Sequence, residues 1–112
     1  MTVQTERRGD IHIVRPAGRL DSATSGAFEQ AVAAVFGEGA QRVVIDFSEL
    51  AYISSAGLRG TLIAGKKARA IDGGRLVLCA LNPSVREIFE VSGFTNIFTL
   101  CDDLDAALAE LA

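Results

Sequence analysis

The pattern of apolar and polar positions divides the chain into short strands and amphipathic helices. Residues 2–8 and 11–16 flank a Gly-Asp turn dipeptide, a pattern typical of a β-hairpin. In the second run Ile11 and Ile13 share one face, and His12 lies on the other. We therefore expect His12 to be an exposed strand residue and not a catalytic one.

The rest of the chain alternates between helical and buried-strand patterns. Apolar residues within 22–40 recur at helical spacing until two glycines end the helix. Residues 42–47, Arg-Val-Val-Ile-Asp-Phe, contain an apolar core without polar alternation, which is typical of a strand buried on both faces. The same two patterns repeat further along, predicting helices over 57–71, 82–93 and 102–112 and strands over 75–81 and 94–100.

This order of elements is typical of an α/β fold. Strands that alternate with helices predict a mixed, mostly parallel β-sheet of four to five strands packed with about four helices. The chain has 112 residues and no linker or repeat, so we expect one domain, residues 1–112. Partner sites on such sheets gather at the carboxyl ends of strands, here near the Gly-Arg-Leu-Asp segment 18–21 and after the strand at 43–47.

Composition excludes several classes of protein. No run of eighteen apolar residues occurs, so no membrane-spanning helix is predicted, and the polar segment 1–10 does not resemble a signal peptide, which favours the cytoplasm. The net charge of −3 without a basic block argues against nucleic-acid binding. With one histidine and two cysteines, we expect neither a metal nor a cofactor. Cys79 and Cys101 are expected to be reduced, with Cys79 in the core.

The segment 52–59, Tyr-Ile-Ser-Ser-Ala-Gly-Leu-Arg, places two serines where a strand passes into a helix. One interpretation is a nucleophile, but the Gly-x-Ser-x-Gly elbow lacks its first glycine, and no histidine follows Ser55 to act as a base. A second interpretation is a helix cap, in which the Ser54 hydroxyl accepts a hydrogen bond from the first helical turn. Asp46 and Glu49, just upstream, are expected in solvated or capping roles.

A third interpretation is that another protein modifies Ser55. A cap explains one serine but not the small pair Ala56-Gly57, since glycine costs about 1 kcal/mol of helix propensity relative to alanine. Small residues at these positions would leave Ser55 open to an approaching surface. A phosphate on Ser55 would meet free N–H groups at the helix start and add about −1.5 to −2 charges at pH 7. A docked partner would then face a desolvated dianion.

Four stretches carry a resemblance to a known family: GRLD at 18–21, VVIDFSELAYISSAGLR at 43–59, GGRLVLCALNPSVREIFEVSGF at 73–94, and the acidic closing helix. Over about residues 3–111 the chain resembles the bacterial anti-sigma factor antagonists, which are single STAS-domain proteins. The resemblance implies a STAS-type fold and a partner-switching mechanism. Family members bind an anti-sigma factor, usually a serine kinase of the histidine-kinase-like ATPase type, and this binding frees the sigma factor. Phosphorylation ejects the antagonist, and a PP2C-type phosphatase restores it.

The resemblance also implies roles for single residues. The family motif is often Asp-Ser-Ser/Thr-Gly-Leu, and its first serine accepts the phosphate. The acceptor here is then Ser55, and Ser54 takes the place of the aspartate. Asp21 matches an acidic residue close to the phosphosite, so Asp21 and Ser54 are expected to shape the site. Contacts with the kinase are expected from the helix start and its exposed face, namely Ala56, Gly57, Leu58, Arg59 and Ile63.

Two hypotheses of different class follow. The first is a non-enzymatic regulator that is released from its kinase by phosphorylation of Ser55. The second is a STAS subunit that serves as an unphosphorylated adaptor in a transporter or signalling complex, although the intact acceptor serine argues against it. No oligomeric state is predicted.

Overall fold

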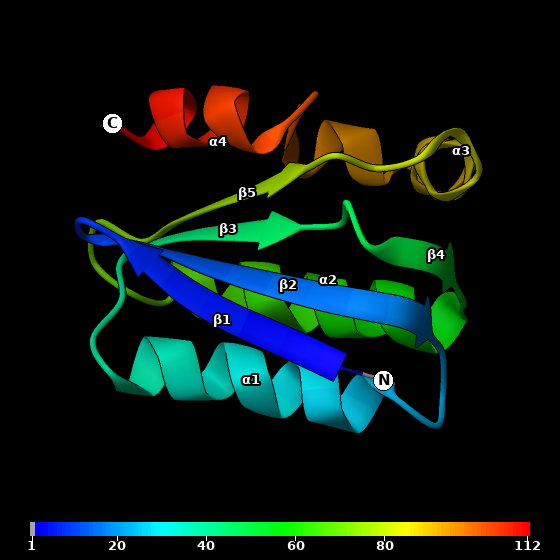
Figure 1. The fold of residues 1–112 in the computed structure, drawn as a ribbon, viewed down its shortest axis with the longest axis horizontal. Helices are drawn as coiled ribbons and strands as arrows, with labels where there is room; N and C mark the ends of the chain where they lie inside the picture. The colour runs from blue at the N-terminus through cyan, green and yellow to red at the C-terminus, as the bar shows by residue number, and fades with distance from the viewer. Residues whose placement is uncertain (1) are drawn as a thin grey trace.

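In the computed structural model, which describes residues 2–112, a six-stranded sheet separates helices packed on its two faces (Figure 1). The strands are β1 (Thr2–Arg8), β2 (Ile11–Leu20), β3 (Arg42–Asp46), β4 (Leu50–Ile53), β5 (Arg75–Cys79) and β6 (Thr99–Cys101). The helices are α1 (Ser25–Gly37), α2 (Ser55–Arg69), α3 (Pro83–Val91) and α4 (Leu104–Leu111), and a 3₁₀ turn, η1 (Phe94–Asn96), precedes β6. The predicted α/β class and the mostly parallel sheet are confirmed.

The long strand β2 organises the sheet. The strand order is β1-β2-β3-β5-β6, with β1 and β2 antiparallel and the other pairs parallel. The first part of β2 pairs with β3, Ile11 opposite Arg42, and its last part pairs with β4, Leu20 opposite Ile53. The second half of β2 thus extends beyond β3 to the place where β4 ends and α2 begins.

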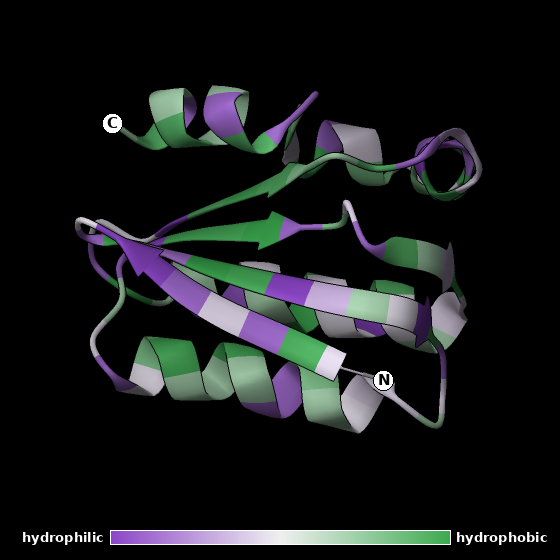
Figure 2. Ribbon diagram, viewed as in Figure 1, coloured by the Kyte–Doolittle hydropathy of each residue, from purple (hydrophilic) through white to green (hydrophobic). Residues whose placement is uncertain are grey.

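Apolar clusters fill both faces of the sheet. The larger cluster joins the sheet to α1, α2 and α3, and it contains the fully buried Phe28, Ile45 and Phe89. The smaller cluster lies under α4 and contains Ile13. Because β3 is buried on both faces, residues 42–47 show no polar alternation. Figure 2 shows the hydrophobic colour concentrated on β3 and β5, whereas the edge strand β1 is mostly hydrophilic.

Three elements differ from the sequence prediction. The strand predicted over residues 11–16 continues as β2 to Leu20. Residues 50–53 form β4, a strand that was not predicted, because four residues with an exposed centre carry no clear periodicity. Residues 94–100 were predicted as one strand and instead divide into η1 and the three-residue β6. The division lets Phe94 and Phe98 both turn towards the larger cluster, with their ring centroids 5.9 Å apart.

Two polar side chains are more buried than expected. His12 is half-buried, and its Nδ1 atom has no hydrogen-bond partner within residues 2–112. Asp46 is only 3% exposed, and its carboxylate accepts hydrogen bonds from Arg15 Nε at 2.8 Å and from the backbone N–H of Ser48 at 2.9 Å. Arg15 also donates to Glu6 at 3.0 Å, so an ionic network crosses β1, β2 and β3.

The two cysteines are free thiols on neighbouring strands, as expected. Cys79 is fully buried in the smaller cluster, which confirms its predicted core position. Burial, together with the nearby charge of Asp46, raises the pKa of the Cys79 thiol to about 12. Cys79 is therefore protonated and unreactive at neutral pH.

Candidate functional site

The two segments singled out from the sequence meet at one edge of the sheet. The end of β2 pairs with the end of β4, and the backbone N–H of Ser54 donates to the carbonyl of Leu20 at 2.9 Å. The carbonyl of Ser54 then accepts from the N–H of Leu58 at 2.9 Å, which starts α2. Figure 1 shows this junction at the side of the molecule where β2, β4 and the start of α2 come together. We call it the rim, meaning residues 19–21 and 52–55.

Ser54 holds the N-cap position by its backbone but does not cap the helix with its side chain. The expectation that its hydroxyl would accept a bond from the first helical turn is wrong, because the N-cap residue makes no side-chain cap bond. Its Oγ atom is instead buried and has no partner in residues 2–112. The residue is held to β2 through its backbone, because its N–H donates to the Leu20 carbonyl.

Ser55 is the first residue of α2 and is exposed. Adjacent hydroxyls on one chain thus have opposite environments, with Ser54 partly buried and Ser55 at the surface. A helix start also presents unsatisfied N–H groups and the positive end of the helix dipole. An anionic group attached to Ser55 would be electrostatically favoured at this position.

Asp21 lies on the same rim, fixed in the turn between β2 and α1. Its Oδ1 atom accepts from the N–H of Ala23 at 3.0 Å and from the hydroxyl of Thr24 at 3.2 Å. Arg19 approaches the other carboxylate oxygen at 3.8 Å. Because Asp21 follows Leu20 directly, and Leu20 pairs with Ile53, the structure brings Asp21 to the edge at which Ser55 is exposed.

Sequence reasoning missed a neighbouring pair, Arg19 and Tyr52. The Arg19 guanidinium lies 4.3 Å from the centre of the Tyr52 ring, a cation–π contact between paired positions of β2 and β4. Both side chains are exposed, Tyr52 by 39%. The pair could not be seen without β4, because only the pairing of these strands places the two residues opposite each other.

Gly57 serves packing and not access. It is buried, and a Cβ atom there would lie 2.6 Å from Ile53 Cγ1 and 2.7 Å from the carbonyl oxygen of Leu20. The absence of a side chain lets α2 approach the ends of β2 and β4 closely. Of the other residues expected at the partner surface, Arg59 is exposed, and Ala56, Leu58 and Ile63 are half-buried.

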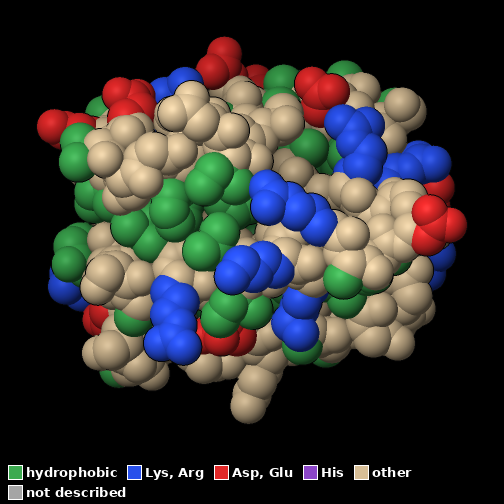
Figure 3. All heavy atoms as spheres, turned by 180° about the vertical axis from the view of Figure 1, so that it is seen from behind, with side chains coloured by type: hydrophobic (Ala, Val, Ile, Leu, Met, Phe, Trp, Pro, Cys, Tyr) green, Lys and Arg blue, Asp and Glu red, His purple; other side chains and the backbone are tan. Residues whose placement is uncertain are grey.

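The outward face of α2 is a continuous strip that begins at Ser55. Residues three or four positions apart lie in line along a helix, so Ser55, Arg59 and Lys66 share one side, with Leu62 and Ile63 between them. The opposite side carries only small buried residues, namely Gly57, Gly60, Thr61, Ala64, Gly65 and Ala68. Viewed from behind, the molecule shows Lys and Arg side chains gathered at the centre of one face, beside a hydrophobic area (Figure 3).

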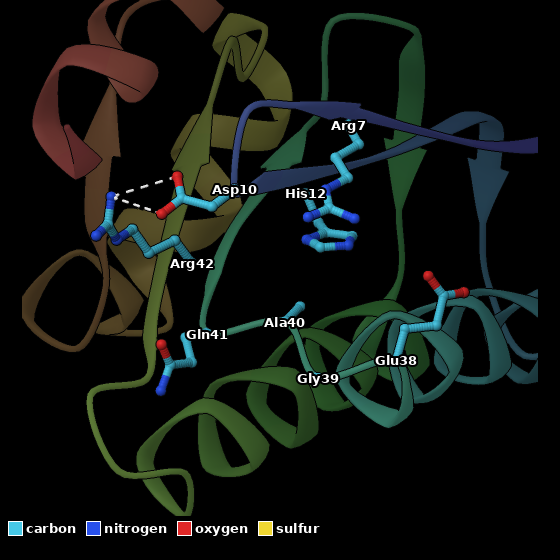
Figure 4. Close-up of a pocket in the computed structure, with 8 residues that line it drawn as sticks. All are labelled: Arg7, Asp10, His12, Glu38, Gly39, Ala40, Gln41 and Arg42. Atoms are coloured by element: carbon cyan, nitrogen blue, oxygen red, sulfur yellow. Dashed lines mark hydrogen bonds and ion pairs between the residues drawn. The ribbon is translucent and has the colours of Figure 1, made fainter.

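A polar cleft of about 120 Å³ lies at the other end of β2, between the β1–β2 hairpin and the end of α1 (Figure 4). Arg7 and His12 enter it from the hairpin, and Glu38 stands at the end of α1. Asp10 and Arg42 also line the cleft and form an ion pair at 3.4 Å. Leu20 lies eight positions after His12 along the strand, a distance of about 26 Å, so the cleft has no part in the rim.

Two further properties concern residues 2–112 only. No helix in this range is long and apolar enough to cross a membrane. No group of three or more His, Cys, Asp or Glu side chains in the same range is arranged to hold a metal ion.

These features define a small α/β domain that exposes a serine at the first turn of a helix, at the carboxyl edge of its sheet. The chain belongs to the STAS domain family, whose sequence pattern matches residues 2–107. The resemblance noted from the sequence is therefore confirmed at the level of the family.

Similar proteins carry related names. The chain is 47% identical over 92 residues to the Bordetella bronchiseptica protein BtrV, which is named as a proposed anti-sigma factor antagonist; the match covers 82% of this chain and 78% of the relative. It is 29% identical over 112 residues to an anti-sigma F factor antagonist of Paenibacillus polymyxa, covering 99% and 95%. A solved structure of an anti-sigma factor antagonist from Mycobacterium paratuberculosis superposes with a TM-score of 0.90 at 28% identity, covering 98% of this chain and 92% of that one.

Proposed function

We propose that this protein is an anti-sigma factor antagonist whose binding is controlled by phosphorylation of Ser55. In its unmodified form it binds an anti-sigma factor that is also a serine kinase with a histidine-kinase-like ATPase fold. The kinase phosphorylates Ser55 and so releases the antagonist, and a PP2C-type phosphatase returns it to the binding form. The protein acts by binding and not by catalysis.

The exposure of Ser55 beside a buried Ser54 hydroxyl carries this proposal. A kinase must bring an acceptor oxygen to the γ-phosphate of ATP, which an exposed side chain permits and an inward-facing hydroxyl does not. The names of the two sequence relatives support the same role. A dianion at the start of α2 changes the charge of the contact surface without refolding the domain.

The remaining site residues take supporting roles. Asp21 and Ser54 shape the surroundings of Ser55 from the two sides of the rim. The partner contacts the start and outward face of α2 through Ala56, Leu58, Arg59 and Ile63. Gly57, being buried, contributes by holding the helix start against β2 and β4.

The test is a phosphorylation assay with the kinase recovered from the native host. The purified protein is incubated with that kinase and ATP, and the phosphate is located by mass spectrometry. We expect one phosphate on Ser55 in the natural protein and in Ser54→Ala, and none in Ser55→Ala. Phosphate on Ser54 alone would contradict the site, and a stable complex without any phosphate would favour the adaptor function.

A binding measurement tests the charge mechanism separately. Ser55→Asp places a negative charge at the position of the phosphate, so we expect it to weaken kinase binding, whereas Ser55→Ala retains binding. Calorimetry with both variants gives the two affinities directly. Equal affinities would argue against release by charge.

A further inference from the structure

The cations of the molecule are distributed unevenly. The chain has eleven lysines and arginines, and ion pairs within residues 2–112 engage six of them: Arg8, Arg15, Arg19, Arg42, Arg75 and Arg86. The other five are Arg7 on β1 and four residues on α2, namely Arg59, Lys66, Lys67 and Arg69. All four α2 cations are exposed. The unpaired positive charge is therefore concentrated on a single helix.

The same helix carries no acidic residue, so its net charge is +4. Since the whole chain has a net charge of −3 and α2 contributes +4, the rest of the chain carries −7. An acidic partner therefore meets net repulsion from the rest of the chain and net attraction from α2. The charge distribution thus orients an approaching acidic surface towards α2.

The strip also has apolar positions among its charges. Leu62 and Ile63 are half-buried and lie between Arg59 and Lys66 on the outward side of α2. Beyond the strip, Arg69 donates to the carbonyl of Ile97 at 3.5 Å, and Ile97 is 41% exposed. Apolar side chains surrounded by charges are typical of protein–protein interfaces, which have an apolar centre and a polar periphery.

We infer that the outward face of α2 is a cationic docking strip that selects a protein partner by an acidic surface. The inference rests on the proposed function and adds to it the chemical character of the partner. The strip from Ser55 to Lys66 is about 16 Å long, which suits one face of a folded partner. An extended polyanion such as DNA would pass beyond the strip and meet the negative remainder of the chain.

The strip gives the phosphate on Ser55 a second effect. Arg59 lies one helical turn after Ser55, at the i, i+4 spacing that brings side chains together. A phosphate on Ser55 pairs with Arg59 and so removes one of the cations that the acidic partner uses. Release then follows both from the added negative charge and from the loss of a docking cation.

The first experiment measures association of the recovered kinase with the unphosphorylated protein by stopped flow. We expect the Arg59→Gln, Lys66→Gln double variant to associate about tenfold more slowly at an ionic strength of about 0.01 M, where charges act over roughly 30 Å, and to differ little at about 0.15 M. Arg7→Gln, which removes a cation of β1 that no ion pair within residues 2–112 engages and that lies outside α2, is the control and should slow association far less than the double variant.

The second experiment needs no kinase. A short oligoglutamate peptide is titrated into ¹⁵N-labelled protein at low salt, with oligolysine as the charge-reversed control. We expect amide shifts centred on residues 59–69, with their loss in the double variant and their retention in Arg7→Gln. Tighter binding to a DNA oligonucleotide or to phosphatidylserine vesicles would overturn the assignment to an acidic protein surface.

The outcomes separate this inference from the proposed function. Suppose that Ser55 is phosphorylated but kinase association does not depend on salt or on the double substitution. The docking inference is then wrong, and the proposed release by phosphorylation is retained. If oligoglutamate binds α2 but Ser55 receives no phosphate, the docking inference is retained and the proposed phosphorylation of Ser55 is wrong. Peptide shifts spread evenly over the surface, or absent, would overturn the strip.

Discussion

At the scale of single residues, two neighbouring serines have separate roles because one strand contact orients them. The sequence placed Ser54 at the helix start correctly, since the change from strand to helix is a local signal. The direction of its hydroxyl could not be predicted, because that depends on Leu20, more than thirty residues earlier, and on a strand that the pattern did not reveal. Ser55, expected to be open to an approaching surface, is exposed.

Ser54→Ala is expected to lower the free energy of unfolding by less than about 0.5 kcal/mol, or to increase it. The substitution removes a buried hydroxyl that has no partner, so no hydrogen bond is lost. Asp103→Ala is the contrast, because the Asp103 carboxylate accepts from the N–H of Ala106 at 2.8 Å at the start of α4. Loss of this hydrogen bond should lower the free energy of unfolding by about 1 kcal/mol. Chemical denaturation of both variants gives the comparison, and equal costs would show that Ser54 does act as a cap.

At the scale of elements, α2 has one face that packs closely on the rest of the fold and one face that is exposed. Its inner face consists of small residues, because the helix lies close to the ends of β2 and β4, to α1 and to Phe98. The sequence interpretation gave Gly57 a role in access, since nothing local showed how near Leu20 and Ile53 would lie. The helix itself could be predicted from its periodicity, but the closeness of its packing is a tertiary property.

Two glycines of α2 should therefore respond differently to the same substitution. Gly57→Ala forces a methyl group against Ile53 and the Leu20 carbonyl and is expected to destabilise the fold by about 1–3 kcal/mol. In Gly60→Ala the new methyl group lies 3.4 Å from Phe28 Cδ2, an ordinary contact, and the helix gains propensity worth up to about 1 kcal/mol. Thermal unfolding distinguishes the two. A Gly57→Ala protein as stable as Gly60→Ala would mean that α2 is not held tightly at its start.

At the scale of the whole molecule, the sheet is joined across three strands by Glu6, Arg15 and Asp46. The alternation of elements was sufficient to predict the α/β class, because it depends on periodicity along the chain. The ionic network was not predicted, and Asp46 was expected in a solvated or capping role. Only the register of β1, β2 and β3 places these three side chains side by side.

The network makes stability depend on pH. Burial raises the pKa of Asp46, but the hydrogen bonds from Arg15 and Ser48 outweigh burial and hold the pKa below its usual value. A lowered folded-state pKa stabilises the fold above the unfolded value of about 4, and the contribution is lost as the pH falls through the folded value. The pKa of Glu6 is lowered as well, chiefly by its hydrogen bond with Arg15.

Asp46→Asn is expected to lower the free energy of unfolding by about 3 kcal/mol at pH 7, because it removes the carboxylate from a largely buried ion pair. The loss should shrink as the pH falls below about 4, where the natural protein loses the same contribution. Urea titrations at several pH values measure both effects. Asp10→Asn, which removes an exposed pair, should cost at most about 1 kcal/mol. If the free energy of unfolding of Asp46→Asn ran parallel to that of the natural protein from pH 7 down to about pH 3, this role of Asp46 would be contradicted.

The position of α4 determines where a fluorescent reporter can be attached for imaging this protein in living cells. This last helix packs on the face of the sheet opposite the one that α2 covers, where it ends at Leu111. A fluorescent protein fused after Ala112 through a flexible linker would thus be attached across the sheet from Ser55. A tag inserted near residue 22 would instead stand on the rim itself. The end of α4 is therefore a better attachment point for a reporter than the turn between β2 and α1.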